Sequence, residues 1–242
     1  MSEPRAADVA AERLRRRDLL ASADLYLVTE ESLSAGRRSE AVIEAALEAG
    51  TRVVQIREKD GTARRAYEIA VAARTLTRRH GALLIVNDRV DIARACDADG
   101  VHLGQADLPI AEARRSLGGA ALLGLSITAA EQLGSHDVAA ADCLGVGAVY
   151  PTGSKLDAET TGLGLLGETR AAMRDSRIPT LTIVAIGGIT AANAAATIRA
   201  GADVVAVITA VTAAPDPGLA AAELIETVRA AQGLRPSSRS SR

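Results

Sequence analysis

Three apolar runs in the second quarter of the chain end in polar and charged residues that a buried strand does not require. These runs cover residues 52–59, 83–88 and 99–107. If they are neighbouring strands of a parallel sheet, their carboxyl ends meet at one rim, which then carries cations from Arg57 and Lys59. The same rim carries carboxylates from Asp88 and Asp107. Cations beside paired carboxylates are suited to binding a polyphosphate together with its divalent metal.

The first run ends in the motif Gln55-Ile56-Arg57-Glu58-Lys59, in which long polar side chains recur at alternate positions. Strand alternation places Gln55, Arg57 and Lys59 on one face, toward the open end of the sheet. There they can hydrogen-bond a ring and contact phosphate oxygens. A charged loop after a strand is the alternative. We treat the whole motif, Ile56 and Glu58 included, as candidate substrate-binding residues.

Asp88 and Asp107 follow two neighbouring strands of the expected sheet. Magnesium favours one or two carboxylates, several waters and substrate phosphates, and two aspartates near one rim fit that arrangement. Each aspartate could instead cap a helix, because one helix is expected from residue 89 and Pro109 follows Asp107 closely. Asn87, beside Asp88, could hydrogen-bond a substrate amine or a ring nitrogen.

Two later segments have the composition of phosphate-binding loops. The first follows the expected sixth strand at residues 150–155 and offers hydroxyl, amide and ammonium donors. The second contains Gly187 and Gly188, which let a ligand approach the backbone just before a helix N-terminus. The run at residues 204–209 ends the expected eighth strand beside it, and barrels often bind phosphate with the loops after strands seven and eight. An ordinary tight turn is the alternative for each segment.

Ser126 ends the expected fifth strand and could donate a hydrogen bond to a pyrophosphate oxygen. No set of histidine and aspartate around it indicates a nucleophile. His102 lies at the end of an apolar strand and is better explained as a structural histidine with satisfied hydrogen bonds. Cys96 and Cys143 lack the spacing of a zinc site.

The composition narrows the class of protein. The chain has 242 residues, of which 48% are hydrophobic and 24% charged, enough for one large core. A net charge of −2 and an aromatic content of 1% argue against a nucleic-acid partner. No apolar stretch approaches the roughly 20 residues of a membrane helix, and the polar N-terminus is unlike a secretory signal. Together with two scattered cysteines, these features predict a cytoplasmic protein that acts on small molecules.

Apolar runs alternate with helical patterns along the chain. Strands are expected at residues 25–28, 52–56, 82–86, 99–103, 121–125, 142–147, 181–185 and 203–208, and helices at 5–22, 38–49, 62–79, 89–96, 109–117, 128–140, 163–174, 190–200 and 217–232. This alternation predicts an α/β fold, a (β/α)8 TIM barrel with an extra N-terminal helix. A doubly wound open sheet is the alternative, but no glycine-rich dinucleotide motif follows the first strand. The barrel is expected to cover residues 1–232 as a single domain, followed by a disordered tail at 233–242.

Six short motifs, in this order, resemble those of the thiamine-phosphate synthase family. They are residues 55–59, 86–88, 99–107, 124–126, 150–155 and 186–189. Each motif is short, but six in register over nearly the whole chain are specific. The resemblance implies a Mg²⁺-assisted transferase. Such an enzyme joins hydroxymethylpyrimidine pyrophosphate to a thiazole phosphate, or its carboxylated form, and releases pyrophosphate and thiamine monophosphate.

The resemblance also implies a role for each candidate residue. The pyrimidine pyrophosphate would be held by Gln55, Arg57, Lys59 and Asn87. The Mg²⁺ ligands would be Asp88 and Asp107. The residues acting on the departing pyrophosphate, and so the implied catalytic set, would be Arg57, Lys59, Ser126 and Lys155. The thiazole phosphate would be surrounded by Thr152, Gly153, Ser154, Gly188, Ile208 and Thr209.

The chain departs from the family pattern at three positions. Ser154 replaces a frequent Thr, Ala185 replaces a frequent Gly, and Thr128 stands where a His is common. Thiazole tautomerases resemble the same family and place a catalytic His at the position of Thr128, so an isomerase is the first alternative. A non-catalytic barrel that binds a phosphate ligand is the second. Association into a homo-oligomer is also left open.

Overall fold

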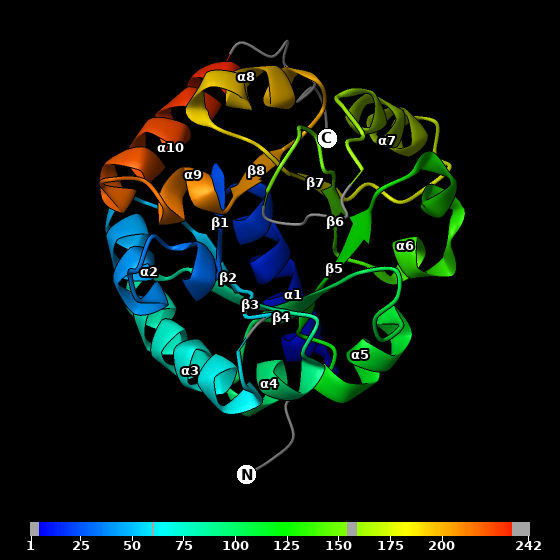
Figure 1. Ribbon diagram of the computed structural model, residues 1–242. Helices are drawn as coiled ribbons and strands as arrows, with labels where there is room; N and C mark the ends of the chain where they lie inside the picture. The colour runs from blue at the N-terminus through cyan, green and yellow to red at the C-terminus, as the bar shows by residue number, and fades with distance from the viewer. Residues whose placement is uncertain (1–4, 60, 154–158, 234–242) are drawn as a thin grey trace.

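The structure, a computed structural model, describes residues 5–59, 61–153 and 159–233. Eight parallel strands close into a barrel in the order β1 to β8, and helices surround it (Figure 1). β1 (Leu25–Thr29) pairs with β2 (Val53–Ile56) on one side and with β8 (Val204–Val207) on the other, which closes the ring. The (β/α)8 barrel predicted from the sequence is therefore confirmed.

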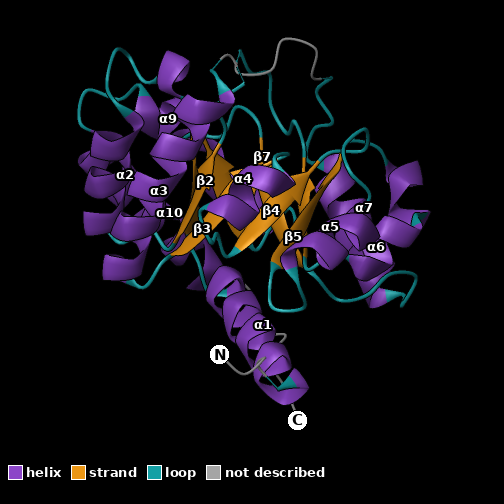
Figure 2. Ribbon diagram, turned by 90° about the horizontal axis from the view of Figure 1, so that it is seen from below, coloured by secondary structure: helices purple, strands orange, loops and turns teal. Residues whose placement is uncertain are grey.

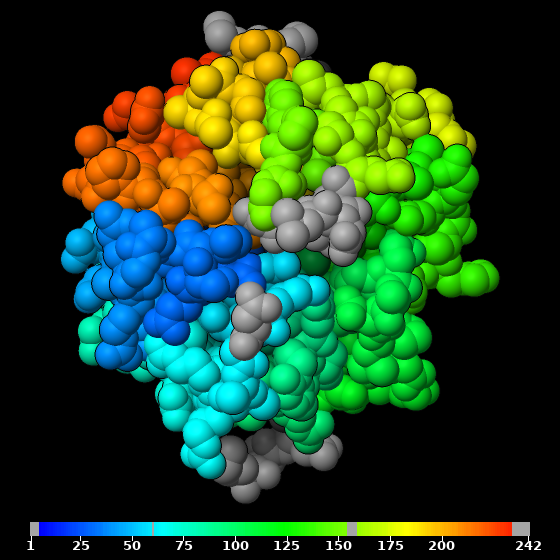
Figure 3. Space-filling model, in the orientation of Figure 1, coloured from blue at the N-terminus to red at the C-terminus, as the bar shows by residue number. Residues whose placement is uncertain are grey.

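The other elements follow in alternation. The remaining strands are β3 (Leu83–Asn87), β4 (Gly100–Leu103), β5 (Leu122–Ile127), β6 (Cys143–Val146) and β7 (Thr182–Ile186). The longer helices are α1 (Ala6–Ala21), α2 (Ser39–Glu48), α3 (Ala63–His80), α5 (Ile110–Leu117), α7 (Gly164–Arg174), α8 (Ala191–Arg199) and α10 (Pro217–Gly233). The short helices are η1 (Glu31–Leu33), α4 (Val90–Ala95), η2 (Ala130–Gly134), α6 (His136–Ala140) and α9 (Thr209–Thr212). The blue early segments lie beside the orange late ones, as a closed ring requires (Figure 3).

The helix expected at residues 128–140 is interrupted. Between η2 and α6, Ser135 has extended backbone angles, φ −72° and ψ 151°, which end one helix and begin the next. η1 and α9 are too short for helical periodicity to reveal them in the sequence. α10 includes Gly233, the first residue of the expected tail, and the rest of that tail lies outside the described residues. Within the described ranges, no helix has both the length and the apolarity needed to cross a bilayer.

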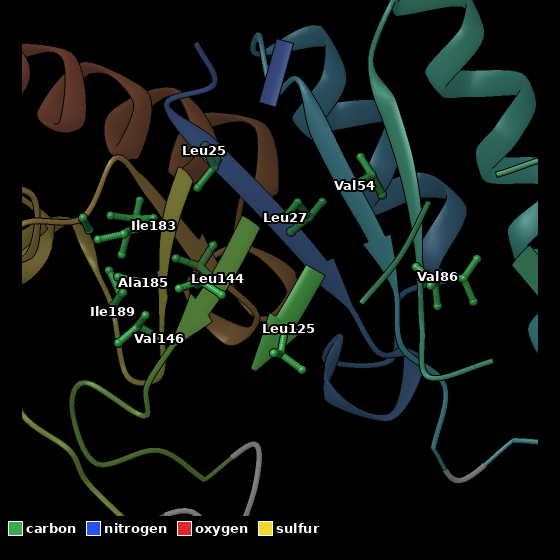
Figure 4. Packing of buried hydrophobic residues seen from close by; sticks show 14 of the residues in the cluster. Leu25, Leu27, Val54, Val86, Leu125, Leu144, Val146, Ile183, Ala185 and Ile189 are labelled. Carbon is green, nitrogen blue, oxygen red and sulfur yellow. The ribbon is translucent and has the colours of Figure 1, made fainter. Parts of the chain in front are cut away.

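Strand alternation divides the buried side chains of the barrel into two layers. Outward-facing side chains such as Leu27, Val54 and Leu144 pack beneath the helices and are fully buried. Figure 4 shows these three residues on different strands, within the same apolar cluster. Fully burying one such side chain contributes about 1.5–3 kcal/mol. The outer layer is therefore the main apolar contact between the helices and the barrel.

Inward-facing side chains form a second, smaller layer. This inner cluster contains Val53, Leu83 and Leu122 from the strands together with Leu20 from α1. α1 lies at the end of the barrel opposite to the loops that follow the strands (Figure 2). The last turn of α1 therefore closes the amino-terminal mouth of the barrel, and the opposite mouth stays open.

A buried carboxylate fastens α1 to this closed end. Asp142, whose side chain is 0% exposed, accepts hydrogen bonds from Arg13 Nε at 2.8 Å and from Arg114 Nη2 at 2.7 Å. It also accepts the backbone N–H of Leu123 at 2.9 Å. Burying a carboxylate costs free energy unless the group is paired and hydrogen-bonded, and these three contacts together offset that cost.

Asp142→Ala should lower the free energy of unfolding by about 3 kcal/mol or more, because it leaves two guanidinium groups without their buried counter-ion. Chemical denaturation followed by circular dichroism measures this loss. Asp175→Ala is the matched control, since that carboxylate is exposed and lies 3.8 Å from Arg174; it should change the same quantity by less than about 1 kcal/mol. Equal losses in the two variants would contradict the proposed anchor.

Candidate active site

A cavity of about 750 Å³ opens at the carboxyl ends of the strands. Every strand of the barrel, or the loop directly after it, contributes to its wall. In chain order these contributions include Val28, Gln55, Asn87, His102, Ser126, Gly147, Ile186 and Ile208. Barrels of this kind carry their chemistry at this end. The cavity is therefore the candidate active site.

Alternate residues at the end of β2 reach the cavity. Gln55, Arg57 and Lys59 all line it. Gln55 Nε2 donates a hydrogen bond of 2.8 Å to the hydroxyl of Tyr26, which belongs to the inner layer of β1. The guanidinium of Arg57 forms an ion pair with Glu30, whose carboxylate is buried. Polar and cationic groups thus follow one another from the floor of the cavity to its rim.

Ile56 and Glu58, between these residues, point the other way. Ile56 belongs to the outer apolar layer. The Glu58 carboxylate accepts hydrogen bonds from the backbone N–H of Glu31 at 3.1 Å and from the Ser39 hydroxyl at 3.3 Å, and burial raises its pKa. Both residues line a smaller pocket of about 230 Å³, which shares Lys59, Asn87 and Asp88 with the main cavity. Ile56 and Glu58 themselves do not line the main cavity.

Asp88 and Asp107 both line the cavity. Asp107 Oδ2 accepts the backbone N–H of Gly104 at 2.6 Å, and Lys59 Nζ lies 3.3 Å from Asp88 Oδ2. Asp88 has a left-handed φ of 58°, which aspartate adopts more readily than most residues. Burial and then the neighbouring Asp107 raise the pKa of Asp88, while Lys59 opposes this shift.

Two carboxylates in one cavity, one of them with a raised pKa, form a favourable binding site for a divalent cation. The parts of the chain that the structure describes contain no cluster of three or more His, Cys, Asp or Glu suited to a metal. Magnesium does not require one, because it binds one or two carboxylates and completes its shell with water and phosphate oxygens. The donor set of Asp88 and Asp107 therefore fits Mg²⁺ bound together with a phosphate ligand.

His102 lies inside the barrel, with Nε2 3.0 Å from the hydroxyl of Ser126. Gly124 and Gly145 make room for the imidazole, because a Cβ at these positions would lie 2.3 Å and 2.6 Å from a ring atom. Burial lowers the pKa of His102 to about 4, although the charge of Asp107 opposes this shift. The floor of the cavity therefore contains a neutral imidazole near pH 7.

The loops after β6, β7 and β8 form the opposite wall. The predicted thiazole-phosphate residues that line it are Thr152, Gly153, Gly188, Ile208 and Thr209. Gly188 has a φ of 62°, and a Cβ there would lie 2.4 Å from the carbonyl oxygen of Pro151. Glycine is needed at this position for two of the loops to meet. Ser154 and Lys155 lie outside the described residues.

The sequence motifs do not identify every residue of the site. Tyr26 occupies an inward position of β1, and strand alternation applied to that strand would have found it. Glu159 lines the cavity from the loop after β6, where the sequence does not distinguish it from any exposed carboxylate. Glu30 contacts Arg57 only because β1 pairs with β2, and no local signal in the sequence indicates that pair.

This combination of a barrel, paired carboxylates and glycine-lined loops is typical of (β/α)8 enzymes that act on phosphorylated compounds. Comparison with known proteins defines the class further. The family model described as thiamine monophosphate synthase matches residues 25–211. The chain therefore belongs to the thiamine monophosphate synthase family, as its motifs predicted.

Relatives named thiamine-phosphate synthase are similar over most of their length. That of Haloarcula marismortui is 48% identical over 205 residues, which cover 85% of this chain and 96% of the relative. That of Chloroflexus aurantiacus is 50% identical over 208 residues, covering 86% and 94%. The solved structure of thiamine phosphate pyrophosphorylase from Pyrococcus furiosus is 36% identical, with a TM-score of 0.77 over 90% of this chain and 98% of that one. The predicted enzyme class, a transferase of the thiamine-phosphate synthase type, is confirmed.

The imidazole of His102 should stay neutral from pH 8 down to about pH 5, because its pKa lies near 4. An NMR titration of the ring signals should show no movement over that range. Since the unfolded chain takes up this proton near the ordinary value of 6.5 and the folded chain does not, stability should fall as the pH drops from about 6.5 toward 4. This part of the pH dependence should be absent in His102→Gln. A His102 signal that titrates near pH 6.5 would refute the assignment.

Asp88→Asn should stabilise the metal-free protein, because burial and Asp107 favour the uncharged form at this position and asparagine tolerates the φ of 58°. Mg²⁺ with inorganic pyrophosphate should raise the melting temperature of the wild type, measured by scanning fluorimetry, and have little effect on the variant. Asp175→Asn, at an exposed position, is the control and should respond like the wild type. An equal response in all three proteins would exclude Asp88 as a ligand.

Proposed function

We propose that this protein joins hydroxymethylpyrimidine pyrophosphate to a thiazole phosphate, including its carboxylated form, and forms thiamine monophosphate and pyrophosphate. Family membership supports the overall reaction. The observation that carries the proposal is that four charged side chains line a single cavity. Arg57 and Lys59 lie there with Asp88 and Asp107, opposite a wall built from the loops after β6, β7 and β8. Both substrates carry phosphate, and the cavity offers one wall to each.

The wall formed by β2 and β3 would bind the pyrimidine pyrophosphate. Gln55 and Asn87 have carboxamides that can pair with the donor and acceptor edges of an aminopyrimidine. Arg57 and Lys59 follow Gln55 in the chain, beyond the end of β2, and would contact diphosphate oxygens. The ring would therefore lie toward the floor of the cavity and the diphosphate toward its rim.

Asp88 and Asp107 would hold Mg²⁺ beside that diphosphate. When bound, the ion would neutralise negative charge on the departing pyrophosphate. Ser126 would donate a hydrogen bond to the same group. His102 supports this role if its Nε2 carries the proton, because it then donates to the Ser126 oxygen at 3.0 Å and leaves the hydroxyl proton for the pyrophosphate.

The opposite wall would bind the thiazole phosphate. Gly188 precedes α8, whose N-terminus favours an anion, and the hydroxyls of Thr152 and Thr209 can donate to phosphate oxygens. Gly153 and Ile208 complete this wall. Ser154 and Lys155 are assigned here by the resemblance alone.

The reaction requires no general base. The bond between the pyrimidine methylene carbon and the pyrophosphate oxygen breaks, and the pyrophosphate keeps the electron pair. The electron-rich aminopyrimidine stabilises the resulting carbocation, and the thiazole nitrogen then forms a bond to that carbon with its lone pair. With the thiazole phosphate itself, no proton moves. The carboxylated form must in addition lose CO2, and the ring carbon that bore the carboxylate keeps the electron pair and takes up one proton from water. In both cases the cavity acts on the coupling step by positioning and by electrostatic stabilisation of the leaving group. One fixed donor of this kind is typically worth about 3–4 kcal/mol.

The two alternatives are less well supported. A thiazole tautomerase would need an acid or base near Thr128, and threonine cannot act as one at neutral pH. A non-catalytic barrel would not explain why the relatives described above carry the name of a synthase. Small-molecule substrates follow from the proposed reaction. The cytoplasmic location and association into a homo-oligomer stay predictions.

Asp107→Ala should lower the rate of thiamine monophosphate formation by about 100-fold or more, because it removes a ligand beside the leaving group. The purified protein is mixed with both substrates and magnesium, and thiamine monophosphate and pyrophosphate are quantified by chromatography. The variant should also lose the dependence of its rate on magnesium concentration, whereas Asp175→Ala should behave like the wild type.

One result would decide against the proposed reaction, and another would decide only against the proposed metal site. If the wild type formed no thiamine monophosphate, the assigned reaction would be wrong. If Asp107→Ala kept the magnesium dependence of the wild type, the proposed reaction would stand, but the metal site would have to be assigned to other residues.

A further inference from the structure

A buried glutamate lies directly behind the cationic edge of the cavity. Glu30 follows β1, and its side chain is only 5% exposed. It forms an ion pair with Arg57, whose side chain is 13% exposed and which lines the cavity. A carboxylate beside a proposed diphosphate site works against anion binding, so its presence there calls for an explanation.

The strand register places the two residues side by side. β1 and β2 are parallel, and their ladder ends with Thr29 opposite Ile56. The backbone N–H of Arg57 then donates to the carbonyl oxygen of Thr29 at 2.9 Å, which carries the pairing one residue further. Glu30 is extended, with φ −148° and ψ 120°. Since Thr29 and Ile56 face outward, Glu30 and Arg57 both face inward.

A hydrogen bond also holds the backbone of Glu30 in place. The Ser34 hydroxyl donates to the Glu30 carbonyl oxygen at 2.8 Å, and η1 begins at the next residue. The backbone of Glu30 is therefore held in place, and its buried carboxylate pairs with one edge of the Arg57 guanidinium. An arginine side chain has many rotamers, and a carboxylate that holds it in a single one reduces the reorganisation needed on substrate binding.

We propose that Glu30 is a positioning residue for Arg57. It holds the Nη1 edge of the guanidinium against the wall of β1 and so directs the cation toward the position of the diphosphate. The inference rests on the proposed function of Arg57. Glu30 itself does not touch the substrate, and its negative charge weakens diphosphate binding in exchange for a fixed geometry.

Two substitutions separate geometry from charge. Glu30→Ala removes both, and kcat/KM for the pyrimidine pyrophosphate should fall by roughly 10- to 100-fold, because a misplaced group at a reacting centre is costly. Glu30→Gln keeps an acceptor oxygen for Arg57 and should recover most of that loss. The KM for the thiazole phosphate should change by less than about threefold in either variant, since that substrate is bound by the opposite wall.

A double-mutant cycle tests whether Glu30 acts through Arg57. Arg57→Ala alone should reduce kcat/KM, and adding Glu30→Ala to it should reduce kcat/KM no further. Glu31→Ala is the matched control, because this neighbouring carboxylate pairs with Arg65 at 2.7 Å and does not line the cavity. It should leave both KM values unchanged. Circular dichroism establishes that each variant is folded. If Glu30→Ala does not fold, Glu30→Asp replaces it, because this variant keeps the charge but withdraws the carboxylate from Arg57 by one methylene, so kcat/KM for the pyrimidine pyrophosphate should still fall.

Several outcomes would overturn the inference. They are a Glu30→Ala variant with unchanged kcat/KM, additive losses in the double variant, and equal changes in the KM of both substrates. Absence of thiamine monophosphate formation by the wild type would instead refute the proposed function. A wild type that is active while a folded Glu30→Ala variant behaves like it would refute only the role of Glu30.

Discussion

The closed parallel register of the barrel is the constraint on which the site depends. All strands run in the same direction, so their carboxyl ends meet at one mouth, while α1 closes the other. Alternation then sends every second side chain inward. Residues as distant in sequence as Gln55 and Thr209 reach the same cavity for this reason. The composition of the cavity wall therefore depends first on the strand register and only then on any single sequence motif.

Charges in the cavity are arranged to receive a cation and an anion together. Burial and the neighbouring Asp107 disfavour the ionisation of Asp88, and a divalent metal would relieve this effect. Lys59 already contacts Asp88 at 3.3 Å, and Arg57 is paired with Glu30. Each cation thus has a carboxylate partner within the protein. Among the described residues that line the cavity, the carboxylates of Asp88, Asp107 and Glu159 outnumber the cations Arg57 and Lys59, and a divalent metal would offset this excess of negative charge.

The sequence was sufficient to predict the barrel and much of the rim, because both follow from local patterns. The alternation of Gln55, Arg57 and Lys59 can be read from a single run of residues. Tertiary pairing was not predictable in this way: the contact of Glu30 with Arg57 requires the register of β1 against β2. Likewise, the space for the imidazole of His102 exists because glycines on β5 and β6 lie beside it. The helix expected at residues 128–140 ran through Gly134, a poor helix former, and Ser135, a favourable N-cap residue, and these two residues could have indicated the break.

A neutral floor suits the proposed reaction better than a charged one. The carbocation would form on the methylene between the pyrimidine ring and the diphosphate, so positive charge near the ring would oppose it, whereas positive charge near the diphosphate would favour it. The cavity meets these two requirements at different depths, with the cations near its rim and an uncharged group at its floor. Arg57 and Lys59 follow Gln55 toward the rim, while the half-buried His102 stays uncharged because desolvation lowers its pKa to about 4. The glycines that enclose this histidine therefore serve the electrostatics of the site as well as its packing, since an imidazole fully exposed to water would be partly protonated near neutral pH.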